Sequence, residues 1–330
     1  IHFDFELPGS THNMRVSDPF FCALSHSGDQ AFSGSGSLKI LVDRMVRGDQ
    51  CKVFYKPFYT RNDFSDERYS PVFSPTAYPG KTVSMKLYLE QWEGWETLGI
   101  APYVHTVYGK EDLLQGYIKL VQEQWISVEF TIPDVEGDIV DEVGIVIEGY
   151  SPSKKKSLGL IYLDDFAITG PSAYTIDIKK QKKEFGCVTP FATDHGAWDL
   201  YGKTLNLMRC EEAFAYTGNY YGTVSAAVIP RHGASHLITA RAQGAKRFYA
   251  AGFDEKGKAV LLKNDFGFTV LAECGFDWEY DREYRMQMEC RGGHIIFSVD
   301  GVKVLEAEDD SFSYGMFGCG SVKTGRTSFA

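Results

Sequence analysis

The sequence predicts an all-β protein made of two antiparallel β-sandwiches in tandem. Three observations support this class. The chain has 330 residues, which is enough for two domains that each have a core. Short segments of alternating apolar and polar residues, separated by turn signals, recur along it with little helical periodicity. A strand-like stretch near the middle ends in a strong break, so we expect domains at 1–171 and 172–330.

That stretch is SLGLIYLDDFAITGPS, residues 157–172. Leu160, Tyr162, Asp164, Phe166 and Ile168 fall on one face at period two, and this face should be buried. The turn residues at 169–172 then end the strand. A buried carboxylate must be paired, hydrogen-bonded or bound to a metal, so Asp164 needs a partner.

The elements expected in the first half are mostly short strands. Residues 83–92 alternate cleanly, with Val83, Met85, Leu87 and Leu89 directed inward. Residues 60–80 carry three prolines and should be irregular or edge-like, and a short helix is expected around 111–120. The other expected strands lie at 37–42, 52–59, 125–132 and 143–147.

The second half begins with a basic linker or solvated strand at 174–183, after which strands return. Asp300-Gly301 between two apolar runs is a strong two-residue hairpin signal, and Gly292-Gly293 also turns the chain. Strands are expected at 236–243, 247–253, 259–263, 284–290, 295–299, 302–305 and 313–319.

Composition argues against several classes of partner. The formal net charge of −10 disfavours nucleic acid and anionic membranes. No apolar run approaches the ~20 residues that span a bilayer. The chain begins with Ile1 and has no signal-peptide pattern, so we expect it to be a piece of something larger.

The seven cysteines are odd in number and form no C-x-x-C, which disfavours a structural zinc site. A dense disulfide scaffold is also disfavoured. We expect most of them to be small buried hydrophobic residues. They are Cys22, Cys51, Cys187, Cys210, Cys274, Cys290 and Cys319.

Four pieces of the first half together resemble the jelly-roll carbohydrate-binding modules of bacterial glycoside hydrolases. These are FE at 5–6, SGSGSLKI at 33–40, W-x-x-x-x-F-T-I-P at 125–133 and IYLDDFAI at 161–168. The resemblance implies a structural calcium ion held by Glu6, the loop backbone near Ser35, and Asp164, with Asp165 and Asp29 in reserve. Calcium prefers carboxylate and carbonyl oxygens. The alternative is that Asp164 accepts backbone hydrogen bonds and binds nothing.

Sugar binding requires flat aromatic faces beside polar side chains. The segment 91–99, QWEGWETLG, places Trp92 and Trp95 among glutamates, and Tyr59 and Arg61 lie in the proline-rich segment. These four are candidate ligand-binding residues. The alternative for each tryptophan is partial burial at the rim of the sandwich.

Residues 190–330 resemble the concanavalin A-like sandwiches, in particular laminin-G-type domains and fructan-binding modules. The motifs are ITARAQGAKRFYAAGF at 238–253 and EYRMQMECRGGHIIFSVDGVKVLEAEDD at 283–310. Arg241, Arg247 and Tyr249 would be its polar candidates, and ordinary surface arginine is the alternative. The pairing of the two sandwiches resembles pairs that are appended to bacterial hydrolases, including proteins of the ADP-ribosylglycohydrolase family, and this resemblance implies an attached hydrolase.

No catalytic residues are predicted. The acids in FDWEYDRE, 276–283, alternate along a strand and would repel one another, whereas glycosidases hold two carboxylates across a bond. No G-x-S-x-G, H-E-x-x-H or phosphate-loop motif occurs in a suitable context.

The sequence therefore favours a non-catalytic region that binds a glycan and targets an attached catalytic domain. One alternative is a structural or protein-interaction region that supports such a domain, and a less favoured one is a glycoside hydrolase. Glycan targeting predicts an extracellular or cell-surface location, whereas the odd number of cysteines points toward the cytoplasm.

Overall fold

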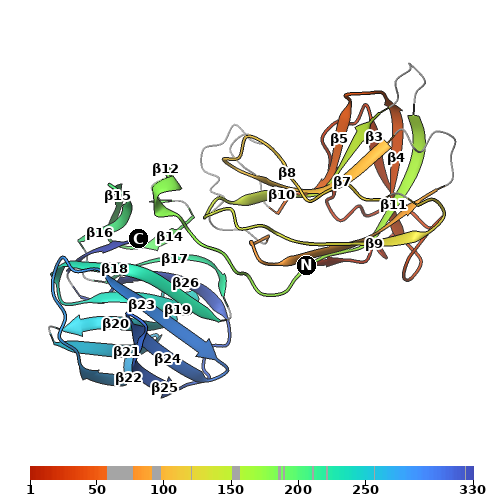
Figure 1. Ribbon diagram of the computed structural model, residues 1–330. Coiled ribbons are helices and arrows are strands. Elements are labelled where there is room, and N and C mark those ends of the chain that lie inside the picture. The colour runs from red at the N-terminus through yellow and green to blue at the C-terminus, as the bar shows by residue number, and fades with distance from the viewer. Residues whose placement is uncertain are drawn as a thin grey trace. The chain divides into compact units, whose positions relative to one another are not determined.

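The chain forms two compact units in the computed structural model, which Figure 1 shows as a ribbon. One unit comprises Ile1–Val135 and Ile139–Ala173, and the other comprises Glu136–Asp138 and Tyr174–Ala330. The structure describes all residues except 58–76, 91–97, 120, 151–156, 185–186, 189, 210–211, 221, 256 and 324. The expected boundary after residue 171 lies two residues before Ala173, where the first unit ends.

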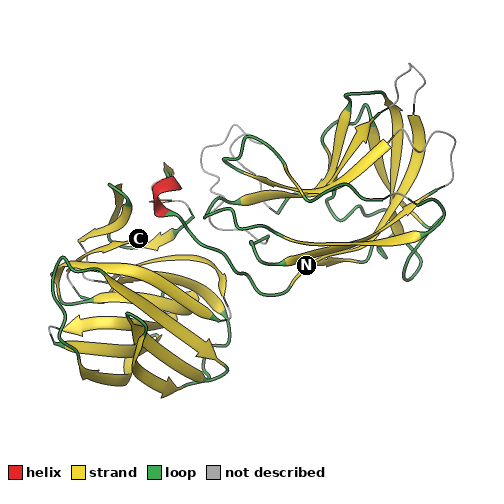
Figure 2. Ribbon diagram, viewed as in Figure 1, coloured by secondary structure: helices red, strands yellow, loops and turns green. Residues whose placement is uncertain are grey.

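The first unit is a β-sandwich of two antiparallel sheets, and strands dominate both units in Figure 2. The strand order in the six-stranded sheet is β3-β4-β11-β6-β9, with β1 paired to β11; that in the five-stranded sheet is β2-β5-β10-β7-β8. The six-stranded sheet contains β1 (His2–Phe3), β3 (Cys22–Ser27), β4 (Ser37–Met45), β6 (Thr82–Leu89), β9 (Trp125–Thr131) and β11 (Ser157–Thr169). The five-stranded sheet contains β2 (Arg15–Val16), β5 (Gln50–Tyr55), β7 (Leu98–Thr106), β8 (Leu113–Leu114) and β10 (Val140–Gly149).

Alternation along the strands builds the core of this unit. Val83, Met85, Leu87 and Leu89 of β6 are buried in one apolar cluster, which confirms the prediction for this strand. Residues of the opposite parity, such as Lys86, are only partly buried. The apolar side chains that meet between the two sheets therefore form the core of the sandwich.

The alternation predicted for β11 is wrong in its first half. Ile161 and Leu163 face the core, together with Phe166 and Ile168 further along. A register shift between Asp164 and Ala167, with Asp165 at φ 48°, inserts a β-bulge that reverses the parity. Leu160, Tyr162 and Asp164 therefore lie on the other face, but Tyr162 and Asp164 are still buried there, as the sequence predicted.

The helix expected at 111–120 is also wrong, because its described part, 111–119, is extended. Leu113 and Leu114 pair with Val104 and Tyr103 of β7, as β8 in Figure 1. Gly116 adopts φ 95°, a conformation that an α-helix does not allow. Hydrogen bonding to the sheet edge outweighs the weak helical periodicity of this segment.

The second unit is a larger antiparallel β-sandwich. One seven-stranded sheet has the order β14-β17-β26-β19-β20-β21-β22, the other has β15-β16-β27-β18-β23-β24-β25, and β12 pairs with β13. The first sheet contains β14 (Ala192–Asp194), β17 (Ala213–Tyr220), β19 (His236–Gly244), β20 (Arg247–Glu255), β21 (Lys258–Asp265), β22 (Phe268–Gly275) and β26 (Gly315–Ser321). The second contains β15 (Ala197–Tyr201), β16 (Thr204–Arg209), β18 (Thr223–Gly233), β23 (Tyr284–Arg291), β24 (His294–Val299), β25 (Val302–Glu308) and β27 (Gly325–Phe329); a 3₁₀ helix at Ile178–Lys180, β12 (Lys183–Glu184) and β13 (Cys187–Val188) precede the sandwich.

The core of the second unit lies between the two seven-stranded sheets. Trp278 stacks on Phe253 with ring centroids 5.4 Å apart, and both side chains are fully buried. Asp300 and Gly301 have φ of 50° and 81° and join β24 to β25 in the predicted hairpin. The all-β class and the two tandem antiparallel sandwiches are thus confirmed.

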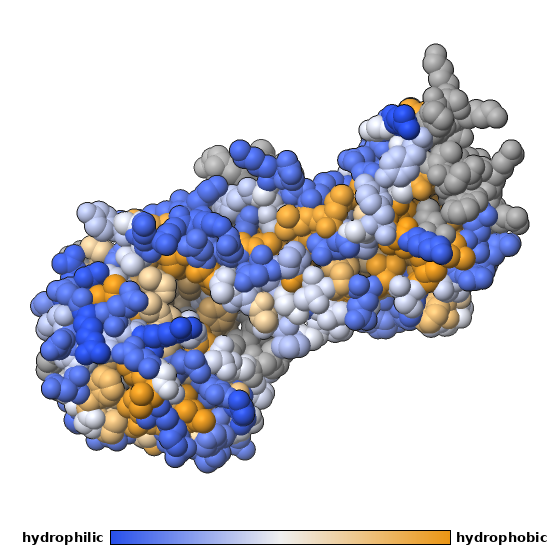
Figure 3. All heavy atoms as spheres, viewed as in Figure 1, coloured by the Kyte–Doolittle hydropathy of each residue, from blue (hydrophilic) through white to orange (hydrophobic). Residues whose placement is uncertain are grey.

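The surface shown in Figure 3 is mostly hydrophilic on both units, with apolar side chains between the polar ones. Cys22, Cys51, Cys274, Cys290 and Cys319 are free, and all of these but Cys274 are buried, as expected for small hydrophobic residues. Among the described residues, no helix is long and apolar enough to cross a membrane.

Candidate functional site

The outer face of the five-stranded sheet in the first unit is polar and aromatic. On β5, β10 and β7, Val53, Ile145, Ile147, Ile100 and Val104 point into the core. The residues of opposite parity form the other side of the sheet, because side chains alternate along a strand. We call this side the outer polar face; it comprises Gln50, Lys52, Phe54, Lys56, Tyr103, His105, Glu142, Val146 and Glu148, with Asp141 from a β-bulge and Asp112, Tyr117 and Tyr150 from adjoining segments.

An apolar patch lies in the middle of this face. Phe54, Tyr103 and Val146 form a small buried cluster that is separate from the main core. Gly144 pairs with both Phe54 and Tyr103 across the sheet, so its missing side chain leaves room for the two rings. The Tyr103 hydroxyl donates to Glu142 Oε2 at 2.9 Å, and desolvation raises the pKa of this tyrosine well above its usual value.

Charged groups surround one end of the patch. Lys52 Nζ lies 2.7 Å from Asp112 Oδ1, 3.8 Å from Glu142 Oε2 and 5.2 Å from the centroid of the Tyr103 ring. Lys56, only 8% exposed, lies 3.6 Å from Asp141 Oδ2 and 3.9 Å from Glu142 Oε1. Each carboxylate therefore has a lysine beside it, which offsets part of the cost of its burial.

A β-bulge between Val140 and Glu142 brings two consecutive acids together with His105. His105 Nδ1 lies 2.6 Å from Asp141 Oδ1, and this hydrogen bond raises the pKa of the imidazole despite its partial burial. Within the described part of the chain, His105, Asp141 and Glu142 are the group whose ligand atoms are close enough to hold a metal ion. Because lysines already neutralise both acids, the geometry does not require one.

Two exposed tyrosines stand at the other end of the face. The hydroxyls of Tyr117 and Tyr150 both donate to Glu148 Oε2, at 2.5 and 2.6 Å. Desolvation would raise the pKa of Glu148, but these bonds and one from Gln50 outweigh it and lower the pKa. The rings, 56% and 41% exposed, are thus held on a carboxylate that stays ionised.

The residues predicted to hold calcium converge on one loop. Asp164, fully buried, accepts the backbone N–H groups of Phe32, Ser33 and Asp165 at 2.8, 3.1 and 2.7 Å. Glu6 accepts from the backbone N–H and the hydroxyl of Ser35 at 2.9 Å each.

A glycine makes this arrangement possible. Gly34 has φ 59°, and a Cβ there would lie 2.2 Å from the Glu6 carboxylate. Gly36 adds another backbone N–H to Glu6 at 3.1 Å. The loop therefore wraps closely around the two carboxylates.

This geometry bears on whether calcium fits. Glu6 and Asp164 are hard oxygen ligands of the kind that calcium prefers. The loop, however, presents N–H donors to them, and the Ser35 N–H rather than its carbonyl faces Glu6. Backbone donors satisfy Asp164, as the alternative stated for it expects, and calcium stays a prediction.

Four of the predicted ligand-binding residues belong to segments that the structure does not describe. Tyr59, Arg61, Trp92 and Trp95 lie outside the described residues. Their role stays a prediction from the sequence.

The structure buries two of the three candidates of the second unit. Arg241 is 3% exposed and donates to the carbonyls of Gly292, Phe312 and Cys290. Tyr249 is fully buried, and its hydroxyl donates to Asp309 Oδ1 at 2.6 Å. Neither side chain faces a ligand at the surface.

A register shift in β19 explains the placement of Arg241. It falls between Ala240 and Gly244, and Arg241 takes φ 52° there, so its guanidinium turns inward. Arg241 and Tyr249 together anchor the 309–314 loop. The remaining candidate, Arg247, pairs with Asp265 at the surface at 3.1 Å.

The outer polar face is not evident from the sequence, because the pattern of β7 does not read as a strand. Pro102 interrupts the alternation of LGIAPYVH, although Tyr103 and His105 share a parity. A usable signal was present on β5, where Gln50, Lys52 and Lys56 alternate with apolar residues.

Comparisons with known proteins find structural neighbours only. No protein-family model matches the chain, and no curated protein matches it. Among solved structures, it is similar to the carbohydrate-binding module CBM66 from Bacillus subtilis, with 20% identity over 42% of this chain and 91% of that one, at a TM-score of 0.40.

Two other neighbours are family 22 modules. The C-terminal module of Clostridium thermocellum Xyn10B shares 17% identity over 52% of this chain and 94% of its own, at a TM-score of 0.34. The tandem CBM22-1-CBM22-2 domain of Paenibacillus barcinonensis Xyn10C shares 10% identity over 100% of this chain and 94% of its own, also at a TM-score of 0.34. None of these three is an ADP-ribosylglycohydrolase, and at such values the likenesses carry no argument about what this chain binds.

Proposed function

We propose that the first unit binds a glycan, without catalysing a reaction on it, through the outer polar face. The observation that carries the proposal is the pair of exposed rings, Tyr117 and Tyr150, hydrogen-bonded to one ionised carboxylate on the same sheet face as Lys52, His105 and Glu142.

A sugar ring has apolar C–H faces and a rim of hydroxyl groups. Tyrosine rings pack against the former, and fixed charged groups hydrogen-bond to the latter. Here the polar side chains already hold one another in place, as Lys52 does with Asp112 and Tyr117 with Glu148. Less side-chain freedom is then lost on binding, which favours affinity.

The wider proposal is that this unit directs an attached hydrolase to its substrate. A catalytic domain outside these 330 residues is part of the proposal and is supported by the sequence resemblance alone. The alternative of a protein-interaction region would use the same face, and glycan-binding measurements separate the two.

The test is titration of the whole chain with oligosaccharides found on a glycan array, by calorimetry. Tyr117→Ala/Tyr150→Ala should weaken binding at least tenfold, because both rings that would contact the sugar are removed. Tyr201→Ala is the matched control, since Tyr201 is an 81% exposed tyrosine of the second unit; it should bind like the parent.

A separate variant, Trp92→Ala/Trp95→Ala, examines the site predicted from the sequence. If it abolishes binding while the tyrosine variant does not, the site belongs to 91–97 and the outer polar face is the wrong assignment. If no glycan binds, the proposal fails, and the alternative of a protein-interaction region is then favoured.

A further inference from the structure

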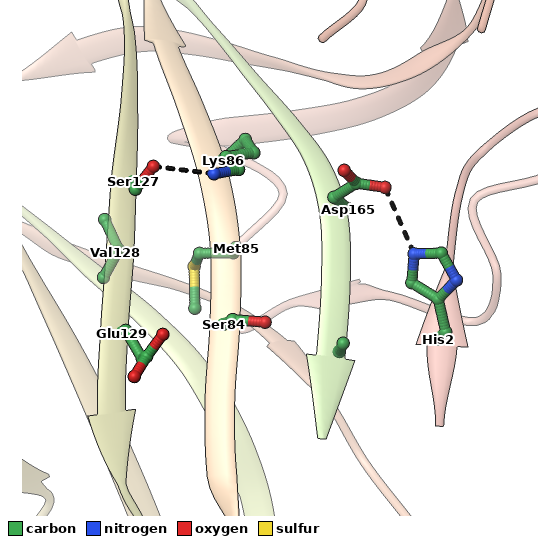
Figure 4. A pocket seen from close by; sticks show the side chains of 9 residues that line it. His2, Ser84, Met85, Lys86, Ser127, Val128, Glu129 and Asp165 are labelled. Atoms are coloured by element: carbon green, nitrogen blue, oxygen red, sulfur yellow. Dashed lines mark hydrogen bonds and ion pairs between the residues drawn. The ribbon is translucent and has the colours of Figure 1, made fainter. Parts of the chain in front are cut away.

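A hollow lies on the opposite side of the first unit, on the outer face of the six-stranded sheet. Its volume is about 300 Å³. Small side chains on three neighbouring strands form its floor. Ala167 on β11 is the cross-strand partner of Ser84 on β6. Two residues further along β6, Lys86 is the partner of Ser127 on β9. Figure 4 shows the longer side chains of His2, Asp165, Lys86 and Glu129 around this floor.

The polar groups around the hollow are held in place by one another. Lys86 Nζ donates to Ser127 Oγ at 2.7 Å, and His2 Nε2 lies 3.1 Å from Asp165 Oδ1; Figure 4 marks both contacts. Asp165 sits at the bulge in β11, and the Ser33 hydroxyl also donates to it at 3.3 Å. The hollow thus offers fixed hydroxyl, ammonium, imidazole and carboxylate groups within a small volume.

Aromatic rings adjoin the hollow along the same strands. Tyr88 and Trp125 are partners across β6 and β9, with ring centroids 5.4 Å apart. They lie two residues, or about 7 Å, from Lys86 and Ser127. Phe32, 45% exposed, packs edge-on against Trp125, with the two ring centroids 5.8 Å apart. Lys86 Nζ lies 4.6 Å from the centroid of the Phe32 ring.

We propose that this hollow is a second carbohydrate site, which takes a single sugar ring. The volume is at the lower end of the roughly 300–1,000 Å³ of small-molecule sites. The hollow contains both hydrogen-bond donors and hydrogen-bond acceptors, which suits a neutral ligand with many hydroxyl groups. The adjoining aromatic rings can pack against the C–H faces of such a ligand. The choice of a sugar as ligand rests on the proposed function, whereas the location does not.

The two sites would make the first unit bivalent. The outer faces of two stacked sheets point away from each other, so one sugar chain cannot occupy both sites side by side. Binding of two chain segments would raise the avidity for a polymer without any new contact.

The experiment is calorimetric titration of the whole chain with glucose, galactose, xylose and fructose, and with cellotetraose and xylotetraose. Ser84→Leu and Ala167→Leu each fill the hollow with a side chain that strands tolerate. Ser225→Leu is the control, because Ser225 is an exposed residue of β18 in the second unit. Thermal unfolding of each variant shows that it is folded.

We expect one of the monosaccharides to bind, and both Ser84→Leu and Ala167→Leu to weaken its binding at least tenfold, with Ser225→Leu unchanged. No monosaccharide binding, or equal binding by the filled variants, would overturn the second site.

If tetrasaccharide binding is then lost only in the tyrosine variant, the proposed function stands alone. If only the filled variants lose binding, the second site stands and the outer polar face is refuted.

Discussion

Individual buried carboxylates in this protein are stabilised in different ways. Asp164 is surrounded by backbone N–H groups, Asp141 has His105 and Lys56 beside it, and the partly buried Asp309 accepts hydrogen bonds from Lys263 and Tyr249. Each arrangement replaces the hydration that the charge loses on burial. The residue type alone does not show which arrangement applies.

Replacement of Asp164 tests the first arrangement. Asp164→Asn directs an amide NH₂ group at a backbone N–H, because Phe32 and Ser33 donate to one oxygen and Asp165 to the other. We expect a loss of about 1–3 kcal/mol in the free energy of unfolding, measured by urea titration. Asp43→Asn, at the surface pair with Arg44, should change it little.

The same two variants decide the calcium prediction. If an ion binds beside Glu6 and Asp164, the melting temperature of the parent and of Asp43→Asn rises in excess calcium relative to chelator. Asp164→Asn should then lose this difference. Equal melting temperatures of the parent in calcium and in chelator would exclude a stabilising ion.

His105 makes stability depend on pH. Its hydrogen bond to Asp141 raises the pKa of the imidazole in the folded state, so the folded protein binds a proton more readily than the unfolded chain. The added stability is fully present below the unfolded pKa of about 6.5 and is lost as pH rises through the folded value. The melting temperature should fall more between pH 6 and pH 9 in the parent than in His105→Gln, and parallel curves would contradict this.

At the scale of single elements, β-bulges decide where functional side chains point. At the bulge in β11, Asp164 faces the loop that contains Phe32, and Asp165 lies at the rim of the hollow. The bulge in β10 brings Asp141 and Glu142 to the same histidine, and the shift in β19 turns Arg241 inward. A bulge changes the parity of all later residues in its strand, so simple alternation fails beyond it.

Gly144 of β10 is the element-scale prediction. A Cβ at this position would lie 2.1 Å from the Val53 carbonyl oxygen and 2.6 Å from Phe54 Cα, both of which belong to the backbone of β5. Gly144→Ala should therefore cost about 1–3 kcal/mol of stability by overpacking and weaken glycan binding at the outer polar face.

Gly275→Ala at the end of β22 serves as its control, because a Cβ there meets nothing within 4 Å. Chemical denaturation measures the stability, and calorimetry measures the binding. If both variants unfold at the same denaturant concentration, close strand approach at Gly144 is not needed.

For the whole molecule, the two main apolar cores have no residue in common. One cluster draws on residues up to Ile168, and the other begins at Ile178. Separate cores predict separate cooperative unfolding, since cooperativity follows from shared packing.

Phe253→Ala tests this separation. The side chain is fully buried against Trp278, so we expect its loss to cost about 3–5 kcal/mol in the second unit. Scanning calorimetry should show one transition lowered and another unmoved, with oligosaccharide binding by the first unit retained. A single transition that shifts as a whole would mean that the units unfold together.

The sequence by itself determined the all-β class, the two tandem sandwiches, the inward parity of β6 and the Asp300-Gly301 hairpin, because these depend on local alternation and turn chemistry. It also identified Asp164 as a carboxylate that needs partners. Only the tertiary structure decided which partners those are, because Phe32 and Ser33 lie more than 130 residues away in the chain.

The candidate sites likewise depend on the tertiary structure. Lys52, Tyr103 and Glu142 come from three strands that are distant in sequence, and pairing in one sheet brings them together. The hollow exists because Ala167, Ser84 and Ser127 are small residues on adjacent strands. Register sets both arrangements, and register is a property of how strands pair rather than of any one segment.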